Sequence, residues 1–309
     1  MALPASIPAG NRHASIVFCA CSLGVVILES MRGRIAIFGI SLFASVTCVY
    51  SQWLHYPTPG TPRTKDGKAN LSAPAPRASD GKPDLSGVWQ ADPAPGEVEQ
   101  LLGKVSDVAI VPGDDPRTFS KYFFDILADF KPDEEPMQPE AAESFRKRGR
   151  ANNSEVYCLP IGIPRGELFS VPFKIIQKSG LIVMIYEASG MVRQVYTDGR
   201  KLPADMQPAW LGYSVGKWEA GTLVVETAGF NDKTTLDSLG HPRSESTHMT
   251  ERFRRRDFGH MEGQITIDDP QNYTRPFTIR FNWRLIPDTD VLEAVCAENE
   301  RDVPHLGIQ

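Results

Sequence analysis

"FTIRFNWRL", residues 277–285, is the stretch of the chain that decides the fold. Its hydrophobic side chains, among them Phe281 and Trp283, alternate with polar ones such as Arg280 and Arg284. Successive side chains of a β-strand point to opposite faces, so the alternation predicts a strand with one buried and one exposed face. The inward face decides what a barrel built from such strands could hold. Phe281 and Trp283 would line an apolar cavity, whereas Arg280 would suit an anionic ligand.

The same period-two pattern recurs along the chain after Cys158, with turns rich in Gly, Pro and Asp between the segments. Consecutive short strands joined by tight turns predict an antiparallel meander and not βαβ units. We expect a mainly β fold whose meander closes into a calycin-like barrel, with a β-sandwich as the alternative. The predicted strands are 172–178, 181–187, 191–197, 210–217, 222–228, 246–255, 260–268, 276–286 and 290–297.

Two helices are predicted in the N-terminal part of the folded region. Residues 118–130 carry apolar side chains at helical spacing. Residues 139–150 begin with a proline and place acidic residues early and basic residues late, which suits the helix dipole. These segments predict a short helical subregion before the strands. We find neither a glycine-rich phosphate loop nor an internal repeat.

The first 51 residues have the composition of a targeting segment. Residues 14–28 and 35–50 are apolar runs that are somewhat short for a membrane span. Read from Met31, two arginines precede the second run, and Ser51 follows it at a position suited to signal-peptidase cleavage. We expect translation to start at Met31 and residues 1–51 to be absent from a periplasmic or secreted protein. A two-helix membrane hairpin is the alternative.

The rest of the chain divides into a linker and one domain. Residues 52–84 are rich in proline and almost free of aliphatic side chains, so we expect an extended tether there. Residues 85–309 then form a single β-rich domain. The net charge of −5 gives no basic face for a nucleic-acid partner, and we expect membrane contact only through the N-terminal signal.

Two cysteines, Cys158 and Cys296, remain once residues 1–51 are removed. A pair of cysteines in an exported chain predicts one disulfide between them. Two separate buried thiols are the alternative.

Several segments resemble a family of exported, β-rich bacterial proteins that has no assigned activity. The resembling motifs are "PDLSGVW" (83–89), "GYSVGKWE" (212–219), "ERFRRRDFG" (251–259) and "TIDDP" (266–270). The resemblance implies export and a β-rich fold but no reaction. "LSGVW" is also similar to the first strand of lipocalin-type (calycin) barrels. The chain departs from the family at Arg243, where a second histidine often stands, and at "WEAG" (218–221), where WEGD is expected.

Residues 241–263 gather three of the six histidines and suggest two kinds of site. His241, Glu245 and His248 would lie on one face of a helix and could then hold zinc. The segment has the pattern of a strand instead, so we expect no metal and no other cofactor. A nucleophilic triad could combine Ser244 or Ser246 with His248 and Asp237, but no nucleophile-elbow motif supports it.

Charged residues on the predicted strands are the remaining candidates for catalysis. On the exposed face of a sheet, opposed Glu and Arg residues are ordinary cross-strand pairs. Inside a barrel they would be desolvated and their pKa values shifted, which marks functional sites. The catalytic candidates are His248, Glu251, Arg252, Glu187 and Arg193.

The first functional hypothesis is a carrier that holds a small molecule, apolar if aromatic rings line the pocket, inside the barrel. The alternatives are an extracytoplasmic hydrolase or isomerase that uses the His/Glu/Arg cluster, and an envelope-interaction protein without a pocket. The ligand-binding candidates are Tyr186, Tyr196, Trp210, Tyr213, Phe281, Trp283 and Arg280.

Overall fold

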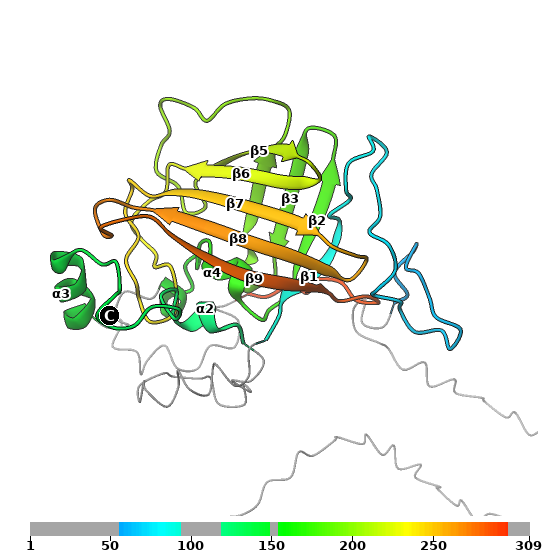
Figure 1. Ribbon diagram of the computed structural model, residues 1–309, viewed down its shortest axis with the longest axis horizontal. Coiled ribbons are helices and arrows are strands. Elements are labelled where there is room, and N and C mark those ends of the chain that lie inside the picture. Colours follow the sequence, from blue (N-terminus) through cyan, green and yellow to red (C-terminus); the bar gives the residue numbers. More distant parts are fainter. Residues whose placement is uncertain (1–55, 94–118, 149–153, 296–309) are drawn as a thin grey trace, which may run out of the picture. The chain divides into compact units, whose positions relative to one another are not determined.

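The computed structural model describes residues 56–93, 119–148 and 154–295. Within these ranges nine strands form one closed barrel, and each strand pairs with its neighbour in chain order (Figure 1). β1 pairs with both β2 and β9 and so closes the barrel. The prediction of a mainly β barrel is therefore confirmed, and the sandwich alternative is wrong. The strands are β1 Gly87–Ala91, β2 Phe173–Lys178, β3 Leu181–Tyr186, β4 Val192–Tyr196, β5 Tyr213–Glu219, β6 Thr222–Ala228, β7 His248–Arg255, β8 His260–Asp268 and β9 Phe277–Leu285.

The join between β4 and β5 is the one parallel pairing in this barrel. It has two paired positions, Val195 with Ser214 and Tyr196 with Val215, whereas the other neighbouring strands pair antiparallel. A parallel pair needs a connection that returns along the length of the strand, and residues 197–212 provide it. The meander is thus antiparallel except at this short join.

β9 confirms the alternation that the sequence shows. Phe281 and Trp283 are buried inside the barrel, and Arg280 and Arg284 are exposed on its outer face. The opposing residue on β8 is Gly263, where a Cβ atom would lie only 2.4 Å from the Phe281 ring. A glycine is therefore required at this position, because the interior is filled by aromatic rings.

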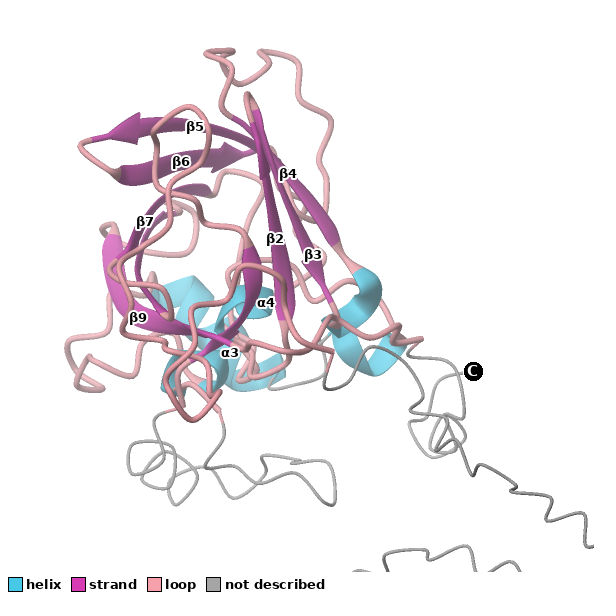
Figure 2. Cartoon of the chain, turned by 90° about the vertical axis from the view of Figure 1, so that its right-hand side faces the viewer, coloured by secondary structure: helices cyan, strands magenta, loops and turns pink. Residues whose placement is uncertain are grey.

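Three short α-helices lie within the described residues: α2 Lys121–Phe124, α3 Pro139–Arg148 and α4 Arg165–Leu168. Figure 2 shows the helices together on one side of the strands. α3 confirms the helix predicted at 139–150 over residues 139–148, and residues 149 and 150 lie outside the described ranges. Of the helix predicted over 118–130, only Lys121–Phe124 is helical within the described residues 119–130, so the prediction is wrong beyond Phe124. There the backbone N–H of Ile126 donates to the Asp237 carboxylate (2.6 Å) and that of Leu127 to Asp125 (2.9 Å), so these groups leave the helical pattern. No helix in the described ranges is long and apolar enough to cross a membrane.

The strand predicted at 290–297 is also wrong for its described part, residues 290–295. β9 already pairs with β1, so the closed barrel offers no free edge to a further strand. Asp290 instead binds the Lys174 ammonium group at 2.7 Å, and the N–H of Leu292 donates to Glu187.

Residues 56–84 are not the extended tether that their composition suggests. They belong to the same compact unit as the barrel and form two turns closed by the bridges Arg63–Ala69 and Arg77–Pro83. Backbone bonds of 2.7 Å from Phe258 and Gly259 to residues 73 and 71 attach the segment to the turn between β7 and β8. Each turn centres on an Asp-Gly pair, and Gly67 and Gly81 both adopt the positive φ that favours glycine.

The two turns are copies of one motif that sequence analysis missed. "PRTKDGKANLS" (62–72) and "PRASDGKPDLS" (76–86) share seven identical positions in the same order: Pro, Arg, Asp, Gly, Lys, Leu and Ser recur fourteen residues apart, and Asn70 stands opposite Asp84. The backbone bonds also recur, from Thr64 to Lys68 and from Ala78 to Lys82. The second copy leads directly into β1.

Candidate functional site

A fully buried cluster of charged side chains occupies the barrel interior. Arg193 on β4 donates through Nη1 to Oε1 of Glu251 on β7 at 2.9 Å, and its Nη2 contacts Oε2 of the same carboxylate. Nη1 also donates to Oε1 of Glu167 on α4 at 2.5 Å. The remaining donors reach Thr227 Oγ1 (2.8 Å) and Ser214 Oγ (3.1 Å). One guanidinium thus joins two carboxyl groups and two hydroxyl groups away from water.

Glu167 favours its protonated form in this cluster. Burial and the negative charge of Glu251 together raise the pKa of Glu167 to about 8, although the positive charge of Arg193 acts in the opposite direction. The Tyr186 hydroxyl donates to Glu167 Oε1 at 2.8 Å, and burial raises the pKa of Tyr186 well above its usual value. Glu167 Oε1 accepts from Tyr186 and Arg193, whereas Oε2 has no hydrogen-bond partner in the described part of the chain. Arg193 and Glu251 then balance each other's charge.

The cluster has the features of a structural core element. Neither of the two clefts described below is lined by any of its members. α4 is held in place by the indole N–H of Trp283, which donates to the carbonyl of Glu167 at 2.8 Å. The cluster joins β4, β6, β7 and α4 through the hydrogen bonds of Arg193 to Thr227, Glu251 and Glu167.

The five predicted catalytic residues do not form one site. Arg193 and Glu251 meet inside the barrel, as described above. His248 and Arg252 lie on the outer face of β7, because they are an odd number of positions from Glu251. Arg252 forms an ion pair with a glutamate of β5 at 3.2 Å. Glu187 accepts a backbone hydrogen bond from the segment after β9. Glu167 was missed, because nothing in the local sequence around α4 indicates that its side chain enters the barrel.

The predicted ligand-binding residues also separate. Three of them face the interior, where their rings pack against other core residues; the Trp283 ring lies 4.8 Å from that of Phe173 and 4.6 Å from that of Phe253. The other four lie on the outer face or in the loop before β5, outside the core. The inward three are Tyr186, Phe281 and Trp283, and the outer four are Tyr196, Trp210, Tyr213 and Arg280.

The predicted triad and the predicted zinc ligands are not assembled either. Ser244 donates from Oγ to Asp269 at 2.7 Å, while Asp237 contacts His241. Glu245 is exposed at the end of the loop, and His248 begins β7. Among the predicted zinc ligands, only His241 belongs to a group of metal-binding side chains in the described residues, and its companions are Asp125 and Asp237.

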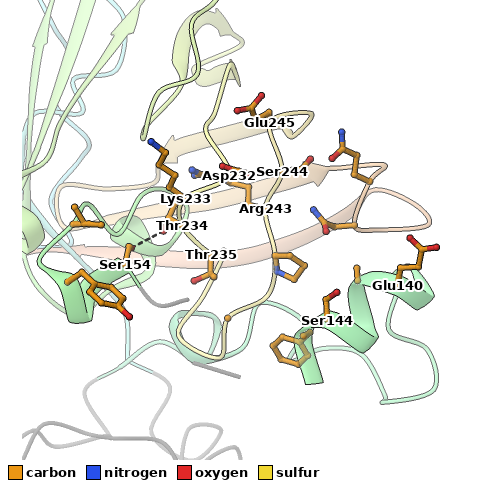
Figure 3. A pocket seen from close by; sticks show the side chains of 18 residues that line it. Glu140, Ser144, Ser154, Asp232, Lys233, Thr234, Thr235, Arg243, Ser244 and Glu245 are labelled. Atoms are coloured by element: carbon orange, nitrogen blue, oxygen red, sulfur yellow. Dashed lines mark hydrogen bonds between the residues drawn. The ribbon is translucent and has the colours of Figure 1, made fainter. Parts of the chain in front are cut away.

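A cleft of about 840 Å³ lies between α3, the 3-10 helix Ser154–Tyr157, the β6–β7 loop and the β8–β9 turn (Figure 3). Its wall is fixed by the Ser154 and Thr234 hydroxyl groups, which lie 3.2 Å apart, and by a bond of 2.8 Å from Thr234 to the carbonyl of Ile161. The lining residues are Glu140, Ala141, Ser144, Phe145, Ser154, Tyr157, Leu159, Asp232, Lys233, Thr234, Thr235, Gly240, Pro242, Arg243, Ser244, Glu245, Gln271 and Asn272.

Arg243 stabilises the loop that forms the cleft wall. Its guanidinium donates to the carbonyls of Ile163 (3.1 Å), Asn231 (3.1 Å) and Trp210 (3.2 Å) and lies 4.4 Å from the centre of the Phe230 ring. Burial lowers the pKa of Arg243 to about 9. Since its terminal nitrogens are used by backbone carbonyls, this arginine holds the loop together and is not available to pair with a ligand.

A second cleft, of about 570 Å³, lies between the N-terminal turns and the barrel. Tyr56, Phe258, Lys174 and Asp290 contribute to its lining. It serves below as the comparison for the first cleft.

Comparisons of the chain with protein-family models, with curated proteins and with solved structures gave no match. The resemblance to exported bacterial proteins stays a prediction, and the site has to be interpreted from its own chemistry. Cys158 lies beside the cleft-lining Tyr157 and Leu159, whereas Cys296 is outside the described residues.

Proposed function

We propose that the protein binds a small, neutral, hydroxyl-rich molecule, such as a sugar or polyol, in the cleft beside α3. The observation that carries the proposal is the combination of an exposed aromatic ring with carboxylate and amide side chains around one cavity. Tyr157 is 46% exposed and lines the cleft together with Glu140, Asp232 and Asn272. An aromatic face packs against the C–H groups of a sugar ring, and carboxylates and amides bind its hydroxyls.

The size and charge of the cleft support this class of ligand. About 840 Å³ is within the range of roughly 300–1,000 Å³ usual for small-molecule sites. Three carboxylates line it, from Glu140, Asp232 and Glu245, against the ammonium group of Lys233 and the guanidinium of Arg243, whose terminal nitrogens are already bound to backbone carbonyls. An anionic ligand would be repelled, and a fatty acid would leave these polar groups without partners. A neutral ligand with many hydroxyls matches both features.

Ligand-observed NMR with a panel of monosaccharides, disaccharides and polyols, and with fatty acids as the opposing class, tests the proposal. The matched variants are Tyr157→Ala in this cleft and Tyr56→Ala in the other, since both tyrosines are exposed. We expect sugar or polyol signals that fall at least tenfold in affinity with Tyr157→Ala and stay unchanged with Tyr56→Ala. Binding of fatty acids alone, or equal loss in both variants, would rule the proposal out.

We further propose that the mature protein acts outside the cytoplasm. The apolar run at 35–50, followed by Ser51, supports cleavage at that point, and the pair Cys158 and Cys296 supports one disulfide. Intact mass spectrometry of protein recovered from a bacterial periplasm measures both features. The proposal predicts the mass of residues 52–309 less two hydrogens, and an uncleaved, fully reduced chain would contradict it.

A further inference from the structure

We propose that Asp125, Asp237 and His241 form a binding site for one divalent transition-metal ion, for which Zn²⁺ is the best chemical match. One ligand atom from each residue lies within 4.8 Å of the other two. This inference does not depend on the ligand proposed for the cleft, and either one can fail without the other.

The three side chains are brought together by two separate segments. Asp125 follows α2, while Asp237 and His241 lie four residues apart in the β6–β7 loop. That loop is closed by the bridge between Thr235 and Pro242 and by a backbone bond of 2.9 Å from Leu236 to His241. Two of the three side chains are therefore held in one tight loop, and the bond of 2.6 Å from the Ile126 N–H to Asp237 places the segment of Asp125 against it.

Two carboxylates at the site share a single basic partner among the described residues, the imidazole of His241. Asp237 is fully buried, and neither it nor Asp125 forms an ion pair with a lysine or arginine in the described ranges. His241 is the cationic neighbour that acts on Asp125, while Asp237 and Glu135 add further negative charge there. Buried carboxylates normally have a cationic partner or a metal, and here one imidazole faces two of them.

The contact between His241 and Asp237 shows where the ion would enter. His241 Nδ1 lies 2.5 Å from Asp237 Oδ2 and 3.9 Å from Asp125 Oδ1, so both carboxylates approach the same ring nitrogen. Without metal a proton occupies the Nδ1–Oδ2 contact. An ion with ligand distances of about 2.0–2.2 Å would replace that proton and separate the two atoms to roughly 3 Å. Where His241 carries protons on both ring nitrogens, binding at Nδ1 would release one proton per ion, and Nε2 would keep the other.

The ligand set and its packing favour a transition metal over calcium. One imidazole nitrogen with two carboxylates suits Zn²⁺ or Co²⁺, whereas Ca²⁺ needs six or more oxygen ligands. The His241 ring is stacked on the Phe145 ring at 4.3 Å and 17°, which restricts its orientation. Gly240, Pro242 and Phe145 all line the cleft, so the ion would lie in the cleft wall.

Titration of the exported protein, stripped of metal, with Co²⁺ tests the site, because bound cobalt absorbs visible light. Zn²⁺ is then added to displace the cobalt. The informative variants are His241→Ala and Asp125→Asn. Asp237 is left unchanged, because its carboxylate also accepts backbone hydrogen bonds from Ile126, Gly240 and His241 and its removal would unfold the loop. His260→Ala is the matched control: His260 Nδ1 lies 2.7 Å from Asp257, and this pair has no third metal-binding side chain among the described residues.

We expect one Co²⁺ per chain, release of one proton, displacement by Zn²⁺, and a loss of affinity of at least tenfold in His241→Ala and Asp125→Asn but not in His260→Ala. Far-UV circular dichroism establishes that each variant is folded. If a variant does not fold, a shift in the melting temperature of the unaltered protein with stoichiometric Zn²⁺ still reports binding. Absence of cobalt absorption and of that shift would overturn the proposal, and so would equal losses in all three variants.

Discussion

Replacing Glu167 by glutamine tests whether this carboxyl group is protonated inside the barrel. The glutamine side chain has nearly the same shape and cannot ionise. Its carbonyl oxygen can still accept from Tyr186 and Arg193, as Oε1 does now. Glu167→Gln therefore imitates the protonated state and isolates the energetic effect of titration.

The sign of the effect follows from the raised pKa of Glu167, from 4.5 to about 8. Between these values the folded protein keeps the proton while the unfolded chain loses it, so stability falls as the pH rises from about 4.5 to about 8. From pH 6 to pH 9 the unaltered protein should lose about 3 kcal/mol of unfolding free energy that the Gln variant keeps. The group is fully buried, so solvent screening does not reduce this figure.

Urea denaturation of both proteins at pH 6, 7.5 and 9 measures the difference. Glu226→Gln, which removes a half-buried carboxyl group from β6, is the matched control for the loss of a negative charge. The two stability curves should diverge with rising pH, with the Gln variant more stable at pH 9. Parallel curves, or a gain in stability of the unaltered protein relative to the variant, would refute the assignment of the proton to Glu167.

Two further predictions concern the barrel interior. Arg193→Met alone should lower the free energy of unfolding by about 3–5 kcal/mol, because it leaves the Glu251 carboxylate buried without its partner. The double variant Arg193→Met/Glu251→Leu should recover most of this loss. Urea denaturation measures both, and a double variant no more stable than the single one would count against the prediction. Gly263→Ala should lower the melting temperature and reduce the free energy of unfolding by about 1–3 kcal/mol or more, since the added Cβ would lie 2.4 Å from Phe281. A melting temperature equal to that of the unaltered protein would show that the ring can move aside.

The strands were predictable because their signal is local. The alternation in β9 and the glycine-containing turns, such as that at Gly259, place both faces and most boundaries without knowledge of the fold. The same alternation within β7 places His248 and Arg252 on the face opposite to Glu251. The closure of β1 against β9 and the parallel join at β4–β5 depend on contacts far apart in the sequence, so local pattern could not specify them.

The candidate site was less predictable, for the same reason. Glu167 and Asp125 lie in segments with no distinctive motif, and each meets its partners only through the tertiary fold. The repeat at 62–72 and 76–86 is different, because its signal is present in the sequence and was obscured by the proline-rich composition. That composition predicted a tether, but the packing of the first copy on the turn between β7 and β8 gives it a fixed structure.

The measurement that tests the proposed binding function most directly is chemical-shift mapping of the ¹⁵N-labelled protein with a sugar or polyol from the panel. The account predicts that the largest shifts fall on the backbone amides of Tyr157, Lys233 and Asn272, which line the cleft from three separate segments. Shifts confined to the barrel interior around Tyr186 and Trp283, or to the second cleft around Phe258, would contradict it.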